Sequence, residues 1–214
     1  KDGRYIEPYI PEGIYKELRL AMDSRWRIVK ELSAIRNRIS RWICIHFPEF
    51  TTVFGDWEGK AALLILHECP TPKKVVEKGI EGIVAIWKKN KIRAVGIKRA
   101  VRLVECAKTS IGAREGLISA ENELSMLLED YESKMRHLER TMTLIEELAN
   151  QIPGFEKLLE IKGVGLVVAA GFLAEVGDIS RFSHPKQIQK LSGLSLKENS
   201  SGKHKGKTTI CKRG

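Results

Sequence analysis

A serine pair near the C-terminal end of the sequence stands among glycines and lysines. The segment 200–207 reads Ser-Ser-Gly-Lys-His-Lys-Gly-Lys. A serine hydroxyl can attack phosphorus when nearby cations hold the phosphate and stabilise the charge of the transition state. The cations that could do this are Lys203, His204, Lys205 and Lys207. No residue here is a compelling general base, although His204 is the one imidazole close by. A flexible basic loop without catalytic function has the same composition.

A glycine turn earlier in the chain could bind a phosphate through its backbone. It reads Ile-Lys-Gly-Val-Gly over 161–165 and precedes an apolar run over 166–176. Glycine permits positive φ and a close approach to a ligand, and the first amides of a helix attract anions. Such a site binds the backbone of a nucleic acid and reads no base sequence. The candidate binding residues are Lys162, Gly163, Val164 and Gly165. A plain turn before a buried helix is the alternative.

Helices must position both candidate sites. A short helix over 155–160, the glycine turn and a second helix over 166–176 have the layout of a helix-hairpin-helix. We expect a third helix at about 185–191. No strand pattern is convincing before residue 190, and the segment 208–211 is the one candidate strand. The predicted fold class is therefore mainly α, with long coiled-coil-like helices followed by a C-terminal domain that contains a helix-hairpin-helix.

Upstream, apolar residues alternate in steps of four and three, which predicts a heptad helix over 113–152. The seam consists of Leu124, Leu128, Tyr131, Met135, Leu138, Met142, Ile145, Ala149 and Ile152. Residues 121–150 hold eight acidic and three basic residues, whereas a predicted helix over 14–47 is basic. The seam therefore packs against its own copy in a homo-oligomer or against helix 14–47 in antiparallel orientation. An ordinary amphipathic helix on a monomeric core is the third possibility.

The composition favours a polyanionic partner. The 214 residues carry a formal net charge of +10, and segment 83–102 contains seven basic residues and no acidic one. That segment is either a nucleic-acid contact or a solvated face. Four widely spaced cysteines predict free thiols in a reducing cytoplasm, and the Cys-His pairs around 44–46 and 67–69 have poor spacing for zinc. No apolar run reaches membrane-spanning length, so we expect no membrane partner.

The expected organisation has four parts. Residues 1–13 connect to a missing upstream domain, and 14–112 form a helical region. The heptad helix occupies 113–152, and 153–214 form a partial C-terminal domain with the helix-hairpin-helix and the serine loop.

The C-terminal motifs resemble a known family. They are Ile152-Pro153-Gly154, the turn 161–165, 174–179, Arg181-Phe182, 187–191, Gly193-Leu194, Ser201-Gly202 and 212–214. Together they resemble the C-terminal domain of the insertion-sequence one-ten type transposases, mobile-element proteins related to the Piv site-specific DNA invertases. The resemblance covers 152–214 strongly and 1–150 loosely.

This resemblance implies DNA transposition and recombination with a serine nucleophile, which corresponds to Ser201 because it directly precedes Gly202; Ser200 is the near alternative. It implies DNA as a partner, a guide RNA, and Mg²⁺ held by an Asp-Glu-Asp-Asp set in a RuvC-like domain. No such set is identifiable here, so that domain would precede Lys1, and we expect no metal site in this segment and no recombination by it alone. The implied location is the prokaryotic cytoplasm, at the nucleoid.

Overall fold

The computed structural model describes residues 9–92, 96–194, 196–197, 200–201, 204–207 and 209–210. They are mainly helical, which confirms the predicted fold class. The chain divides into two compact units. Unit 1 comprises Lys1–Trp26 with Arg140–Gly214, and unit 2 comprises Arg27–Glu139. Two long helices, α1 (Gly13–His46) and α6 (Leu117–Asn150), each contribute residues to both units.

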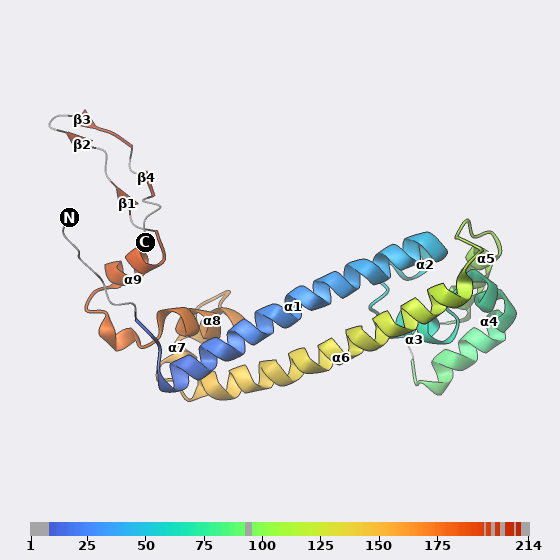
Figure 1. Ribbon diagram of the computed structural model, residues 1–214, viewed down its shortest axis with the longest axis horizontal. Coiled ribbons are helices and arrows are strands. Elements are labelled where there is room, and N and C mark those ends of the chain that lie inside the picture. The colour runs from blue at the N-terminus through green and yellow to red at the C-terminus, as the bar shows by residue number, and fades with distance from the viewer. Residues whose placement is uncertain are drawn as a thin grey trace. The chain divides into compact units, whose positions relative to one another are not determined.

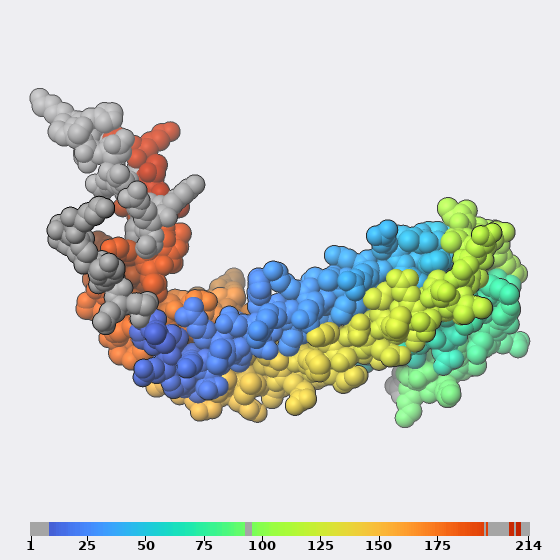
Figure 2. All heavy atoms as spheres, viewed as in Figure 1, coloured from blue at the N-terminus to red at the C-terminus, as the bar shows by residue number. Residues whose placement is uncertain are grey.

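Within unit 2, α1 and α6 lie side by side in antiparallel orientation (Figures 1 and 2). Near one end of the pair, the indole Nε1 of Trp42 donates to the carbonyl of Ala120 at 2.8 Å. Further along, Lys134 forms an ion pair with Glu31. The acidic helix therefore packs against the basic helix of the same chain, which is the intramolecular one of the two seam partners that the sequence left open.

The predicted heptad seam is buried except near its middle. Leu124, Leu128 and Tyr131 belong to the core of unit 2, and Ile145, Ala149 and Ile152 belong to the core of unit 1. Met135 departs from the pattern, since its side chain is 37% exposed. The 3.5-residue repeat thus predicted the buried face of α6 correctly on both sides of this position.

Short helices complete unit 2. They are α2 (Phe50–Phe54), α3 (Lys60–Glu68), α4 (Pro72–Lys89) and α5 (Ile97–Lys108). α4 begins at Pro72, because proline at the first helical position has its φ fixed and no amide left unpaired. Gly79 adopts a φ of +67° and kinks α4. The indole of Trp87 is buried and donates to the carbonyl of Ala61 at 3.0 Å, which joins α4 to α3.

The loop after α5 closes unit 2 against the end of α1. The Glu49 carboxylate accepts from the Ser110 hydroxyl at 2.5 Å and from the Ile111 amide at 2.9 Å. These bonds lower the pKa of Glu49 even though its burial acts in the opposite direction. The Ala113 amide donates to the carbonyl of Ile45 at 2.9 Å. The chain therefore passes very close to the end of α1 at Gly112.

Unit 1 surrounds the helix α8 (Leu166–Val176). The buried residues of α8, the start of α1 and the end of α6 form one core, with Phe155 of α7 (Phe155–Leu159) at its edge. After α8 come the short 3₁₀ helix η1 (Ile179–Arg181) and α9 (Pro185–Leu191). α7, α8 and α9 match the three helices expected here.

Two antiparallel strand pairs follow α9. Strand β1 (Leu196–Lys197) pairs with β4 (Thr209–Ile210), and β2 (Ser200–Ser201) pairs with β3 (His204–Lys205). The sequence indicated only the strand at 208–211. The other three are two-residue strands in a polar segment, which is too short to show the alternation that marks a strand.

We predict that Gly112→Ala destabilises the protein. A β-carbon at this position would lie 2.1 Å from the carbonyl oxygen of His46, a backbone atom that cannot move aside alone. Overpacking of this kind costs about 1–3 kcal/mol. Urea unfolding followed by circular dichroism measures the change in the free energy of unfolding.

Gly96→Ala is the matched control in the same unit, because nothing lies within 4 Å of its β-carbon and its φ is −117°. We expect it to cost about 1 kcal/mol or less, the typical loss when alanine replaces a preferred N-cap residue. Equal losses in the two variants would contradict the close contact at Gly112.

Candidate nucleic-acid interface

The glycine turn between α7 and α8 is open to solvent. Gly163 has a φ of +90°, and the Val164 amide donates to the carbonyl of Ile161 at 2.9 Å. Nothing lies within 4 Å of a β-carbon built on Gly163 or on Gly165. Lys162 and both glycines are exposed. The backbone is therefore accessible to a ligand at the positions that the sequence singled out.

The turn presents the first backbone amides of α8. The Gly165 carbonyl accepts from the amides of Val168 and Ala169, both at 3.0 Å. The amides of Leu166 and Val167 precede these bonds, and among the described residues no hydrogen bond occupies them. Free amides at a helix N-terminus carry a partial positive charge that favours an anion. Val164 differs from its neighbours, because its side chain is half-buried against the unit 1 core.

Burial of α8 fixes this turn in place. Ala169, Ala170, Leu173 and Ala174 are at most 2% exposed. A β-carbon on Gly171 would lie 3.3 Å from the methyl carbon of Met22, so α8 approaches α1 closely at this point. Val168, however, is 57% exposed. The helix is thus buried on one face, and the glycine turn precedes a helix that is packed against the core of unit 1.

The predicted serine site falls on the strand pair β2–β3. Ser201 is the register partner of His204, and Ser200 is the partner of Lys205. Lys207 is exposed after β3. Lys203 and Gly202 lie outside the described residues. Among those described, no hydrogen bond or ion pair joins this segment to the glycine turn.

Comparison with known proteins gives a family match for the segment that contains the glycine turn and the serine pair. Residues 155–214 match the model of the Transposase IS116/IS110/IS902 family. This segment is therefore similar to the C-terminal part of IS110-type transposases. This confirms the predicted resemblance. No curated protein and no solved structure gives a significant match to the chain.

Unit 1 contains a cluster, centred on Arg181, that sequence reasoning missed. The Arg181 guanidinium lies 3.6 Å from the ring centroid of Tyr9 and 4.4 Å from that of Phe182. It also donates to the Val176 carbonyl at 2.8 Å. Gly177 has a φ of +70°, and a β-carbon there would lie 2.5 Å from the Tyr9 ring. Tyr9 is thus held against the end of α8. Local sequence carried no signal for this contact, because its partners lie far apart in the chain.

Asp178 caps the 3₁₀ helix that follows. Its carboxylate accepts from the Ser180 amide at 2.9 Å and from the Ser180 hydroxyl at 2.8 Å. These bonds to the charged form, together with the nearby Arg181, lower the pKa of Asp178. The cap orients η1 and with it the Arg181 side chain that contacts Tyr9.

The Cys-His pairs do not converge on a metal. His67 pairs with Glu132 at 2.9 Å, while the His46 ring packs against Trp42 with centroids 4.7 Å apart. Burial raises the pKa of the Cys69 thiol to about 11, which leaves it protonated and unreactive at neutral pH. In the part of the chain that the structure describes, no three His, Cys, Asp or Glu residues are grouped to hold a metal. Cys44, Cys69 and Cys106 are free thiols.

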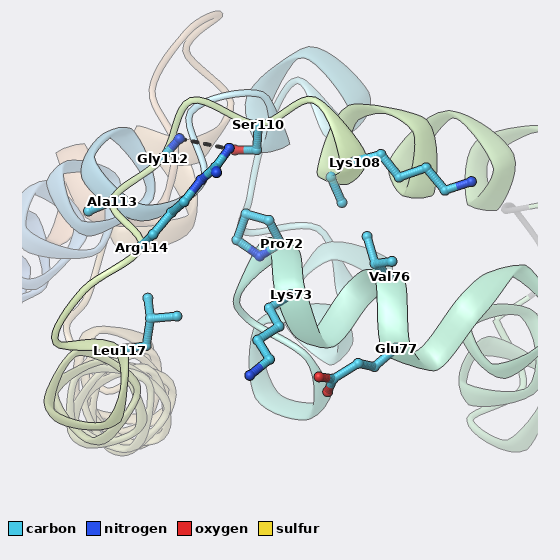
Figure 3. Close-up of a pocket in the computed structure, with 11 residues that line it drawn as sticks. Pro72, Lys73, Val76, Glu77, Lys108, Ser110, Gly112, Ala113, Arg114 and Leu117 are labelled. Carbon is cyan, nitrogen blue, oxygen red and sulfur yellow. Dashed lines mark hydrogen bonds between the residues drawn. The ribbon is translucent and has the colours of Figure 1, made fainter.

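Unit 2 contains a cavity of about 570 Å³ between α4, the end of α5 and the start of α6 (Figure 3). Its cations come from separate elements and do not converge: Lys73 extends from α4, and the amino group of Lys108 points away from Arg114. The Ser110 hydroxyl is already bonded to Glu49 and to the Gly112 amide. The lining therefore assembles no catalytic group.

Among the helices that the structure describes, none is long and apolar enough to cross a lipid bilayer.

We predict that Ser180→Ala raises the pKa of the Asp178 carboxyl toward its ordinary value, because the hydroxyl bond is lost. Titration by NMR measures this pKa directly. A lowered folded-state pKa stabilises the fold above the unfolded pKa, and this stability is lost as pH falls through the folded pKa. The variant should therefore lose less stability than the parent on acidification.

Ser183→Ala removes an equally exposed serine hydroxyl that does not contact Asp178. It should leave the titration unchanged. An unaltered Asp178 pKa in Ser180→Ala would refute the role of the hydroxyl in this cap.

Proposed function

We propose that this chain is part of a DNA transposase or site-specific recombinase that uses a serine nucleophile for strand exchange. The supporting observation is the family match over 155–214, which includes both the glycine turn and the serine segment. The match indicates transposition or recombination as the general activity. The identity of the nucleophile, the guide RNA and the metal are parts of the proposal.

In the proposed reaction, the Ser201 hydroxyl oxygen attacks a phosphorus atom of the DNA backbone. The new Oγ–P bond forms as the bond from phosphorus to one deoxyribose oxygen breaks. The serine proton passes to a base, and the departing deoxyribose oxygen takes up a proton. The phosphoserine intermediate is again a phosphodiester, so the number of phosphodiester bonds is unchanged. Attack by another strand's hydroxyl can therefore reseal the backbone without an external energy source. Lys203, Lys205 and Lys207 are the proposed cations that stabilise the charge on the phosphate.

His204 is the proposed proton acceptor. The support is its backbone register, since it is the residue paired directly with Ser201 across β2 and β3. An imidazole titrates near neutral pH and can exchange a proton with a hydroxyl. Mg²⁺ is proposed to be bound by the carboxylates of a RuvC-like domain, as the resemblance implies, and the guide RNA is proposed on the same ground.

The glycine turn is proposed to hold the DNA backbone near the reacting strand. Its open glycines, the free amides of Leu166 and Val167 and the exposed Lys162 support this role. These features also suit a non-catalytic helix-hairpin-helix module that binds or scaffolds DNA, which is the alternative function. The two functions differ in whether a covalent adduct forms.

The homo-oligomer also remains a proposal. The apolar seam of α6 is covered by α1 of the same chain in both cores, so an oligomer through this helix would use its exposed residues, such as Met126 and Leu144. We place the protein in the prokaryotic cytoplasm at the nucleoid, because DNA is the proposed substrate.

We predict that Ser201→Ala abolishes the covalent protein–DNA adduct in the full-length transposase while DNA binding persists. The nucleophilic oxygen is removed, but the cations and the glycine turn stay in place. The adduct is measured with end-labelled DNA by denaturing gel electrophoresis, and binding is measured by gel shift. Ser200→Ala is the control and should retain the adduct.

An adduct that survives Ser201→Ala but not Ser200→Ala would move the nucleophile by one residue. An adduct that survives both substitutions, or that never forms in the parent protein, would favour the non-catalytic module.

We predict that Lys162→Gln lowers the salt dependence of DNA binding by the 214-residue chain. Loss of one phosphate contact reduces the slope of log K against log salt concentration by about 1. Fluorescence anisotropy at several salt concentrations measures this slope. Lys16→Gln removes another exposed charge of unit 1, from α1 rather than from the turn, and it should leave the slope unchanged. Equal slopes for Lys162→Gln and the parent would exclude a phosphate contact at this lysine.

A further inference from the structure

Unit 2 carries a strongly basic surface that the proposed reaction does not use. We name it the α4–α5 basic surface and define it as Lys88, Lys91, Lys98, Arg99 and Arg102. These residues come from the end of α4, the turn after it and the first turns of α5, and all five are exposed. Because α4 and α5 pack side by side (Figure 1), the two groups of cations share one end of the helix pair.

The charge of this surface is not offset by carboxylates. Some cations elsewhere in unit 2 have anionic partners: Arg36 pairs with Glu58 at 2.9 Å, and Lys74 pairs with Glu121 at 2.7 Å. In the described parts of the chain, no salt bridge involves any member of the basic surface. The nearest carboxylates along the chain are Glu81 and Glu105. Lys89 is excluded from the surface because it lines a small cavity together with Glu68.

Helix geometry places the α5 cations on the solvent side. The buried residues of α5 are Ala100, Leu103, Val104 and Ala107. Lys98 and Arg102 are four residues apart and therefore adjacent on the opposite face. Lys98 and Arg99 lie in the first helical turn, where positive charge opposes the helix dipole. Like charges one turn apart also repel each other by a few tenths of a kcal/mol. Both effects destabilise the helix slightly, and the negative charge of a bound polyanion would offset them.

We infer that the α4–α5 basic surface binds the phosphate backbone of duplex nucleic acid. The family match makes nucleic acid the relevant polyanion, rather than an acidic protein. The absence of an exposed aromatic residue favours a duplex over a single strand, because single strands bind through bases stacked on aromatic rings. Between residues 83 and 114 the one aromatic residue is Trp87, and it is 1% exposed.

This surface adds a second contact to the transposase, since it lies in unit 2 and the family match lies in unit 1. The inference depends on nucleic acid being a partner and does not depend on Ser201 being a nucleophile. Binding to a duplex reports on the surface, and the covalent adduct reports on the serine. The failure of one is therefore distinguishable from the failure of the other.

The test is a triple variant of the 214-residue chain, Lys98→Gln with Arg99→Gln and Arg102→Gln. Glutamine keeps the helix propensity close to that of the parent residues. We expect affinity for a duplex to fall by more than about tenfold and the salt slope to fall by about 3, one for each lost phosphate contact. Fluorescence anisotropy with DNA and RNA duplexes of matched sequence measures both quantities and distinguishes the two sources of the backbone. A loss with either duplex supports the inference.

The matched control removes three charges from exposed cations of unit 2 that lie beside carboxylates. It is Arg38→Gln with Arg41→Gln and Lys73→Gln. Arg38 and Arg41 line a cavity with Glu123 and Asp130, and Lys73 lines one with Glu77. The control should change the salt slope by less than 1. Thermal unfolding by circular dichroism should give both triple variants the parent transition.

Three results would overturn the inference. The first is an equal loss of affinity in the control, which would make net charge the only determinant. The second is unchanged duplex binding in the surface variant. The third is tighter binding of the parent chain to single-stranded nucleic acid or to polyglutamate than to either duplex.

Discussion

The antiparallel packing of α1 against α6 is the constraint on which both units depend. Each unit buries one part of this helix pair in its core, with Ile39 and Leu128 in unit 2 and Leu18 and Ile145 in unit 1. α1 carries a basic surplus and α6 an acidic one, but the Lys134–Glu31 ion pair joins a basic residue of α6 to an acidic residue of α1. Exposed ion pairs contribute little to stability, so the apolar seam supplies most of the packing energy.

Some charged side chains of unit 2 form ion pairs within the protein, whereas others remain available to a ligand. Two carboxylates of α6 form ion pairs with side chains of unit 2: Glu121 with Lys74, and Glu132 with His67. The described cations at the end of α4 and the start of α5 form no such bridge. These five exposed cations therefore contribute uncompensated charge to a chain whose net charge is +10. Attraction of a polyanion to such a surface is long-ranged and weakens with salt.

The long helices and their buried faces were predictable, because a 3.5-residue repeat over many turns has no strand-like alternative. Most of the seam from Leu124 to Ile152 was assigned correctly for this reason. The exposure of Met135 was not predictable, since it depends on tertiary packing rather than on periodicity. The starts of α4 and α8 were also predictable, because Pro72 and the 161–165 glycine turn act locally. The strands β1, β2 and β3 were missed because two polar residues carry no pattern.

The candidate sites were predictable to different degrees. The open geometry of Gly163 and Gly165 follows from local sequence, so the turn was located correctly as a structural feature. The contact between Arg181 and Tyr9 joins residues far apart in the chain, and no local signal predicts such a partner. The cross-strand pairing of Ser201 with His204 likewise follows from a register that the sequence did not indicate.

The contact of Tyr9 with Gly177 and Arg181 has a mechanical consequence. Tyr9 precedes α1 in the chain, and its ring packs against Gly177 and Arg181 at the C-terminal end of α8. A force applied to the polypeptide ahead of Tyr9 would therefore act on the exit of α8 before it acted on the first turn of α1. A larger side chain at Gly177 would displace the Tyr9 ring from the end of α8, while the hydrophobic core of unit 1 would stay in place.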